Sequence, residues 1–533
     1  MDYILINGKI YTLDVSNPLV EALAIQGNRI MAVGTANDIH KLKTKTTVVI
    51  DLEGRTVLPG LNDSHLHFYS TGLYLDLVDV MGSRSIQEVK ARIREYINKR
   101  QVKPGTWIRG RGWNHELFTD ESRFITRQDL DEVTMDHPLL LYRTCGHVLV
   151  ANSLAIKLAK LKPGNLKGEY DLEKGIFKEQ AIEALLQAIP DPTIEEIKTT
   201  IKAAMKHANR YGITSVQSDD LMHLPSRNAE KMLAAFQALD KERKLTVRIY
   251  EQAQLPTLDY LKAFLERGLT TGVGSPFFKI GPLKLLADGS LGARTAALRK
   301  PYRDDPLTAG ILNYSNEELY ALVEMAHTHR MQVAIHGIGD RAIEQIIDTY
   351  KKVLQRYPRL DHRHGIVHAQ IMDSHLMAEM KALNLLAYVQ PIFLNYDHRI
   401  VEARVGSLAR TSYAYRTMKR LGIHVAYGTD SPVEKIDPME NIYTAVTRKG
   451  LDGKPEEGWM KEEAVTVEEA VHAYTVEGAY AEFMEDEKGK LIPNYLADLI
   501  VLNQDLFTVP SETIRQTRVL LTMVDGKIVY SNL

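Results

Sequence analysis

Four short apolar runs, widely separated along the chain, each end in side chains that can bind a metal ion. Short apolar runs bounded by polar turns predict buried β-strands, and here they alternate with stretches typical of amphipathic helices. In a parallel βα barrel the carboxyl ends of all the strands meet at one rim, so side chains distant in sequence converge there. The runs are residues 56–67, 333–336, 365–368 and 424–430.

The number of strand-like runs predicts an α/β fold of the (β/α)8 TIM-like barrel type. The run before His65 supplies the first strand. The count reaches eight only if residues 71–199 form a large insertion after that strand, which we expect to lie over the barrel mouth and to shape the substrate pocket. The barrel then comprises residues 58–70 and 200–486. The other predicted strands are 213–217, 246–251, 281–287, 332–336, 365–369, 385–389 and 424–429.

The two ends of the chain share a sequence pattern that differs from the alternating strands and helices of the barrel. Residues 3–51 and 487–530 are short β-rich runs broken by turn signals such as Asn7-Gly8 and Asp525-Gly526. We therefore expect residues 1–57 and 487–533 to pair into one small β-sandwich domain.

Composition excludes several classes of partner. Of the 533 residues 44% are hydrophobic, and the formal net charge is −2, so no electrostatic argument favours nucleic acid or an anionic membrane. The single cysteine, Cys145, excludes an internal disulfide and suits a reducing compartment. No apolar run approaches membrane-spanning length. We expect a cytoplasmic enzyme with a small-molecule substrate, and a homodimer is a reasonable expectation.

Two of the ligand-bearing runs make specific chemical predictions. His65 and His67 are two residues apart on a strand, share a face, and can offer two imidazoles to one ion, although a surface pair is the ordinary alternative. Lys284 lies inside an apolar run, where an unpaired ammonium would be costly. Either Asp288 neutralises it, or the free amine takes up CO2 and becomes a carbamate that can bridge two metal ions. Its place between the histidine-bearing strands favours the carbamate.

The order of the candidate ligands along the chain resembles that of the amidohydrolase superfamily. The candidates are His65, His67, Lys284, His336, His368 and Asp430. Longer strings resemble its amidohydrolase 3 branch, which includes the YtcJ-like proteins and the N-substituted formamide deformylases. Two positions depart from the family pattern: Gly365 and Val367 replace a basic residue and a glutamate, and Thr144-Cys145-Gly146-His147 lacks an aspartate before Gly-His. The matching strings are residues 58–67, 288–298, 336–342 and 428–433, with Ala497-Asp498-Leu499 near the end of the chain.

The resemblance implies a hydrolase that cleaves a non-peptide, amide-type C–N bond, with N-formyl and cyclic amides among the candidates. Two divalent ions, with zinc expected before manganese, iron or nickel, would share a hydroxide whose proton passes through Asp430. A single-metal site, an isomerase or deaminase, and a catalytically silent regulatory protein remain alternatives. The implied ligands are His65, His67, Lys284 and Asp430 for one ion, and Lys284, His336 and His368 for the other.

Other residues are weaker candidates. Asp63 shares the face of the early histidines and could orient one of them. His364 shares the strand face of His368, but we favour His368 as the ligand because it lies nearer the carboxyl end of the strand. The candidates for substrate contact are Arg294, Gln390, His147 and Trp113, with His115 as a further possible pocket residue.

Overall fold

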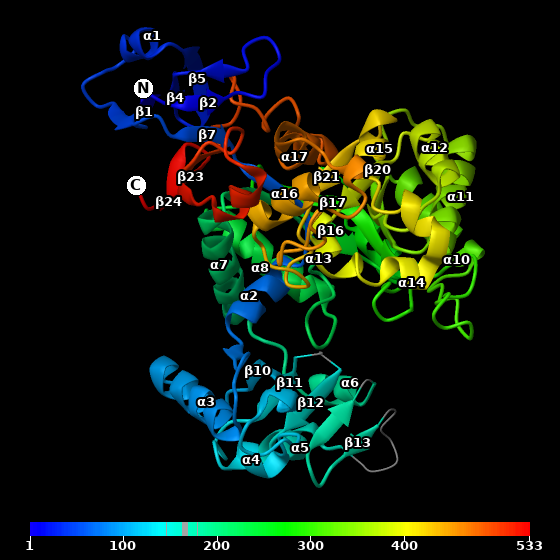
Figure 1. The fold of residues 1–533 in the computed structure, drawn as a ribbon. Helices are drawn as coiled ribbons and strands as arrows, with labels where there is room; N and C mark the ends of the chain where they lie inside the picture. Colours follow the sequence, from blue (N-terminus) through cyan, green and yellow to red (C-terminus); the bar gives the residue numbers. More distant parts are fainter. Residues whose placement is uncertain (145–146, 162–168, 179) are drawn as a thin grey trace. The chain divides into compact units, whose positions relative to one another are not determined.

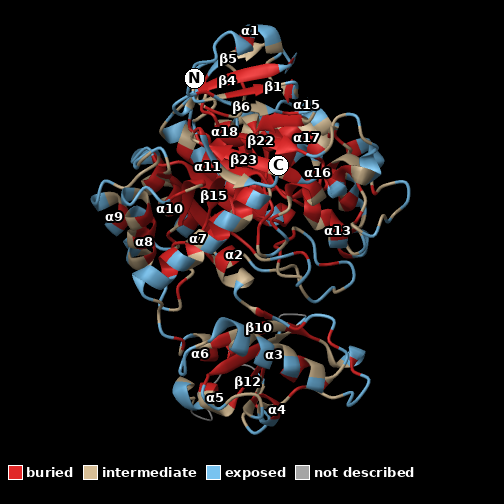
Figure 2. Cartoon of the chain, turned by 90° about the vertical axis from the view of Figure 1, so that its left-hand side faces the viewer, coloured by how far each residue is buried: buried red, intermediate tan, exposed pale blue. Residues whose placement is uncertain are grey.

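A computed structural model describes residues 1–144, 147–161, 169–178 and 180–533, so Cys145 lies outside the described residues. The chain divides into two compact units. The first holds residues 1–70, 201–222 and 234–533, and the second holds residues 71–200 and 223–233. In both, buried residues follow the strands (Figure 2). No helix among the described residues has the length and apolarity needed to cross a membrane.

The first unit contains the predicted barrel. Eight strands pair side by side in one sheet, in the order β21-β20-β19-β18-β17-β16-β15-β8, and every pairing is parallel. All eight predicted runs form strands of this sheet, which confirms the fold class. The strands are β8 (Leu61–Leu66), β15 (Ile213–Ser218), β16 (Arg248–Gln254), β17 (Phe278–Leu286), β18 (Val333–Gly337), β19 (Gly365–His368), β20 (Leu386–Val389) and β21 (Val425–Tyr427).

The first and last strands meet at their carboxyl ends. The backbone N–H of Asp430 donates to the carbonyl of His65 over 2.8 Å, and the N–H of His67 donates to the carbonyl of Ser431 over 2.8 Å. Gly428 permits this approach, because a Cβ there would lie 2.6 Å from the backbone nitrogen of His65. The seam of the barrel therefore brings the first and last of the four ligand-bearing runs together.

Amphipathic helices cover the outside of the barrel. In α11 (Asp340–Arg356) the buried residues Ile343, Ile346, Ile347, Tyr350 and Val353 follow helical spacing and form one face. The hydroxyl of Tyr350 donates to the carbonyl of Gly365 in β19, which fixes this face against the sheet. Figure 1 shows α11 beside α10 (Asn316–Thr328) and α12 (Ser374–Ala382).

Both ends of the chain build a small β domain, as the sequence predicts. One sheet has the order β5-β4-β1-β6, and the other has the order β24-β23-β22-β7-β2-β3. Leu5 and Ile25 of the first sheet share a buried core with Val57 and Leu499 of the second. The strands are β1 (Tyr3–Ile6), β2 (Lys9–Tyr11), β3 (Leu19–Val20), β4 (Ala22–Gln26), β5 (Arg29–Gly34), β6 (Val48–Asp51), β7 (Thr56–Pro59), β22 (Leu499–Leu502), β23 (Val519–Val524) and β24 (Lys527–Ser531).

The second unit is a folded module with a sheet of its own. Six strands have the order β13-β14-β12-β11-β10-β9. Two apolar clusters, one around Trp113 and Leu141 and one around Phe177 and Leu185, give it a core. The exact domain boundaries and the position of this module over the barrel mouth stay predictions. Its strands are β9 (Val78–Asp79), β10 (Ile108–Trp113), β11 (Leu139–Arg143), β12 (Val148–Ala151), β13 (Tyr170–Asp171) and β14 (Ile176–Lys178), and its longest helix is α3 (Ile86–Arg100).

A buried ion pair joins the barrel to the β domain. Nε of Arg248 in β16 lies 2.7 Å from Oδ2 of Asp498, and its Nη2 lies 3.1 Å from Oδ1. Both side chains are 4% exposed. We expect Arg248→Met to lower the free energy of unfolding by about 3 to 5 kcal/mol, because the buried carboxylate of Asp498 keeps its charge but loses its guanidinium partner. Chemical denaturation measures this.

The matched control is Arg399→Met, which removes a surface pair with Asp452 in which both side chains are about half exposed. That variant should lose less than about 1 kcal/mol. Equal losses in the two variants would show that the Arg248 pair does not hold the two domains together.

Candidate metal centre

Three metal-binding side chains converge where β8 meets the end of β21. Nε2 of His67 lies 3.0 Å from Oδ1 of Asp430, and Nε2 of His65 lies 3.6 Å from the same oxygen. Their ligand atoms all lie within 4.8 Å of one another. His65 and Asp430 are buried, and the side chain of His67 is 20% exposed. This is the arrangement that the His-x-His spacing and the last strand predict.

Hydrogen bonds on the far side of each ring fix the tautomers of these histidines. Nδ1 of His65 donates over 2.8 Å to Oε1 of Gln252, whose own amide nitrogen donates to the carbonyl of Ser64. Nδ1 of His67 donates over 3.1 Å to the carbonyl of Asp219. Since each Nδ1 is engaged, Nε2 is the ring atom of both histidines that is left on the side of Asp430, and this set of ligand atoms fits a divalent cation.

The next two strands of the rim contribute His336 and His368. Their ring centroids are 4.5 Å apart, and the ring of His368 lies 5.7 Å from that of His65. Nδ1 of His368 donates to Oε1 of Gln390 over 2.7 Å, which leaves its Nε2 as a ligand atom. His336 differs, because its Nε2 lies 3.0 Å from the carbonyl of Gly289 and Nδ1 is the atom left for a ligand.

Lys284 lies at the centre of this group. Its Nζ is 3.2 Å from Nε2 of His65 and 3.4 Å from Oδ2 of Asp219. The carboxylate partner of this lysine is thus Asp219, at the end of β15, and not Asp288. Asp288 instead accepts the backbone N–H groups of Ala297, Ile338 and Gly339. The structure brings all six predicted ligands to one rim, and their role as metal ligands stays a prediction.

The charges of these groups favour a cation among them. Burial, together with the positive charge of Lys284, lowers the pKa of His65 well below its usual value. Burial opposes ionisation of His67 too, but the hydrogen bond and charge of Asp430 outweigh it and raise the pKa of His67 to about 9. For Asp430, burial is likewise outweighed, by the His67 hydrogen bond and the nearby imidazoles, and its pKa is lowered. The converging acceptors therefore need either a proton on His67 or a metal ion between them.

The backbone is strained at two of the candidate ligands. His368 has a φ of 76° and Asp430 has a φ of 58°, in the left-handed region that side chains with a Cβ rarely adopt. Such residues cost about 1 to 3 kcal/mol and concentrate at functional sites. Asp63 helps to hold the second of them, because its carboxylate accepts the backbone N–H and the hydroxyl of Thr429. Asp63 therefore orients the strand ends rather than a ring.

The four predicted substrate residues lie in different surroundings. Gln390 is buried against His368 and positions that ring. Trp113 is fully buried, and its indole N–H donates to the carbonyl of Leu141, so the structure gives it a packing role. Arg294 pairs with Asp304 over 2.7 Å and is 35% exposed. His147 is exposed in the second unit.

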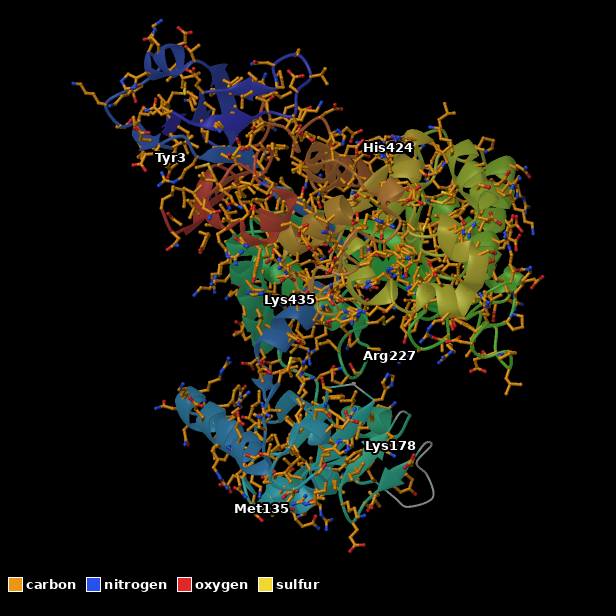
Figure 3. The ribbon with its side chains drawn as sticks, viewed as in Figure 1. Tyr3, Met135, Lys178, Arg227, His424 and Lys435 are labelled. Atoms are coloured by element: carbon orange, nitrogen blue, oxygen red, sulfur yellow. The ribbon has the colours of Figure 1, made fainter. Side chains whose placement is uncertain are left out.

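Neighbouring histidines are committed to other contacts. His364, the alternative to His368, has Nε2 2.8 Å from Nδ1 of His327 and accepts the N–H of Val333 on its Nδ1. Both of its nitrogens are therefore occupied within the protein. His424, labelled in Figure 3, precedes β21 and pairs with Glu477 over 2.8 Å.

The sequence did not indicate a group of polar residues beneath the rim. Gln252 and Asp219 act on the candidate ligands, while Asp220 and Glu251 form a buried acid pair behind them. Oε1 of Glu251 accepts the N–H of Asp220 over 3.0 Å, and its Oε2 has no hydrogen-bond partner among the described residues. The only sequence signal is that each follows or ends a predicted strand.

Burial, followed by the charge of Asp220, raises the pKa of Glu251 well above its usual value. An acid with a raised folded-state pKa stabilises the fold only while it is protonated, so this stability is present at low pH and is lost as the pH rises above the ordinary glutamate value. Glu251→Gln mimics the protonated acid. We expect it to raise the free energy of unfolding by about 1 to 3 kcal/mol at about pH 8, with little gain at about pH 5.

Denaturant titrations at the two pH values measure this difference. Glu266→Gln, at an exposed helix position, is the control and should change stability equally little at both. A Glu251→Gln protein that is less stable than the parent at the higher pH would contradict the assignment of a protonated buried acid.

Comparisons with known proteins agree with this geometry. A family model described as "Amidohydrolase family" matches residues 48–530. The chain is 30% identical to YtcJ of Bacillus subtilis over 98% of both chains. It is 27% identical to the N-substituted formamide deformylase of Arthrobacter pascens, over 99% of this chain and 98% of that protein. The crystal structure of an uncharacterized metal-dependent hydrolase from Pyrococcus furiosus is 31% identical, with a TM-score of 0.80 over 94% of this chain and 99% of that chain.

Proposed function

This chain belongs to the amidohydrolase family. We propose that it is a metal-dependent hydrolase that cleaves an amide-type, non-peptide C–N bond. The observation that carries this proposal is the convergence of His65, His67 and Asp430 with Lys284 at the carboxyl ends of the barrel strands. The 27% identity to an N-substituted formamide deformylase makes N-formyl amines the first substrates to test.

We further propose that this set of ligand atoms holds two divalent metal ions, with zinc as the first candidate. His65, His67 and Asp430 would hold one ion, and His336 and His368 would hold the other. Lys284, carboxylated by CO2, would supply an oxygen to each. Bound divalent ions of this kind supply Lewis acidity, which polarises a carbonyl and makes water a nucleophile near neutral pH.

The chain's own residues would position the reactants and move the proton. Asp430 has a lowered pKa, so its carboxylate is ionised at neutral pH and can accept a proton from the attacking water. It would then return the proton to the leaving nitrogen. Gln252 and Gln390 hold the rings of His65 and His368, so each Nε2 stays aimed at the centre.

Lys284→Ala tests the bridging ligand. We expect the metal content per chain to fall by at least half and amide hydrolysis to fall by about 10³-fold or more, because the shared ligand is lost. Short carboxylic acids should restore part of both, since their oxygens replace the carbamate. Elemental analysis of the purified protein and rate measurements on N-substituted formamides and other amides provide the two readouts.

Lys279→Ala is the matched control, because Lys279 lies on the same strand but its Nζ contacts the sulfur of Met484. It should keep its metal and activity. Full metal content and activity in Lys284→Ala would exclude the bridging role. A stoichiometric metal content without hydrolysis of any compound in a broad amide panel would instead contradict the proposed reaction.

A further inference from the structure

A cavity of about 690 Å³ opens among the loops that follow β17 to β20. Its volume falls within the range typical of small-molecule sites. These loops lie at the carboxyl ends of the strands, as the candidate metal centre does. The lining includes the apolar side chains Leu298, Pro301 and Leu408 and the basic side chains Arg299, Lys300, Arg303 and Arg404.

Three of the four basic residues have no acidic partner. Arg299 lies 2.9 Å from Glu344 and 2.7 Å from Asp373, which balances its charge. Lys300, Arg303 and Arg404 form no ion pair with any described residue. The lining also includes the carboxylates Asp340 and Asp373, so four basic side chains face two acidic ones and the cavity carries an excess of positive charge.

Of the three, Arg404 is the strongest evidence for a bound anion, because it is only 8% exposed. Its Nη1 donates to the carbonyl of Leu291, while its buried Nε has no hydrogen-bond partner among the described residues. Asp397 lies close enough to this guanidinium to interact with its charge, but the two groups form no hydrogen bond. The carboxylate of Asp397 accepts hydrogen bonds from Tyr413 and Gln370. A buried guanidinium without a counter-ion is costly, and a bound anion would offset that cost.

We propose that this cavity is a binding site for the carboxylate or phosphate group of a small organic acid. The planar guanidinium of Arg404 can face two oxygens of such a group, and Lys300 and Arg303 add charge at the exposed side. The apolar side chains would contact the carbon skeleton of the ligand. The site does not depend on the proposed hydrolysis.

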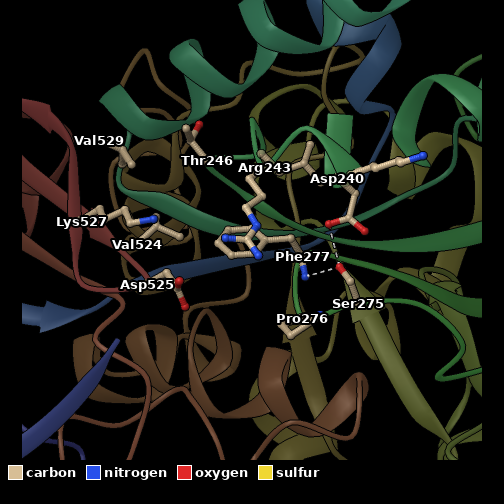
Figure 4. A pocket seen from close by; sticks show the side chains of 12 residues that line it. Asp240, Arg243, Thr246, Ser275, Pro276, Phe277, Val524, Asp525, Lys527 and Val529 are labelled. Carbon is tan, nitrogen blue, oxygen red and sulfur yellow. Dashed lines mark hydrogen bonds between the residues drawn. The ribbon is translucent and has the colours of Figure 1, made fainter. Parts of the chain in front are cut away.

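A second cavity, in which all the basic side chains are exposed, shows why the burial of Arg404 is important to the proposal. It has a volume of about 550 Å³ and lies where the barrel meets the β domain, where Figure 4 shows Arg243 and Lys527. Its lining contains three basic residues, Lys241, Arg243 and Lys527. All three are exposed, so water solvates their charges, and the two carboxylates in the lining, Asp240 and Asp525, leave a smaller excess of positive charge than in the first cavity. That cavity has no desolvated charge that an anion would need to balance, and Arg243 provides a control position.

Isothermal titration of the full chain with inorganic phosphate, and separately with succinate, tests the site. We expect saturable binding of at least one probe at one site per chain. Arg303→Gln should weaken it about tenfold and Arg404→Gln more, while Arg243→Gln leaves it unchanged. Affinity should fall as ionic strength rises. Tighter binding of phosphate than of succinate would assign a phosphate group, and the reverse would assign a carboxylate.

Arg404→Gln also removes the hydrogen bond to Leu291, so a failure of that variant to fold leaves Arg303→Gln and Lys300→Gln as the deciding proteins. Both positions are exposed, and their substitution does not disturb the core. The proposal is wrong if neither probe binds saturably to the parent protein, or if Arg303→Gln and Lys300→Gln bind both probes as tightly as the parent does.

Discussion

The candidate centre depends on the two backbone hydrogen bonds that close the barrel between β8 and the end of β21. The same residues make the closure and supply the ligands, because the N–H of Asp430 donates to the carbonyl of His65 and the N–H of His67 donates to that of Ser431. Gly428 allows this approach where any side chain would collide with the backbone of His65. The same backbone contacts therefore fix both the closure of the barrel and the positions of the imidazoles, and Asp430 takes its place in this seam with a left-handed φ.

Outside this seam, polar side chains hold each ligand from behind. Gln252 and Gln390 accept hydrogen bonds from the Nδ1 atoms of His65 and His368. Backbone carbonyls accept hydrogen bonds from the rings of His67 and His336. The two glutamine contacts are buried, so they are strong and directional. They also concentrate acceptor atoms in a region from which water is largely excluded, and such a region is stable only if a cation or protons balance it.

The strands, and the convergence of the six candidate ligands at one rim, could be predicted from the sequence because the apolar runs carry a local signal. A short apolar run followed by a histidine or an aspartate predicts a strand with a possible ligand at its carboxyl end, wherever the run lies in the chain. The parallel topology then brings these strand ends to one rim. Asp219 and Gln252 also follow predicted strands, but a polar residue at the end of a strand is equally typical of a turn, so position alone does not identify their roles. The packing role of Trp113 and the sheet of the second unit depend on tertiary contacts, which periodicity does not encode.

The partner of Lys284 shows how tertiary structure changes a local expectation. Asp288 is four residues away, and an extended strand would place the two side chains on one face. However, β17 ends at Leu286, and the carboxylate of Asp288 turns to accept backbone N–H groups from Ala297, Ile338 and Gly339. Asp63 does the same for Thr429 across the seam. Both aspartates act as anchors that fix the loops of adjacent strands, and this leaves Lys284 to face Asp219 and the imidazole of His65.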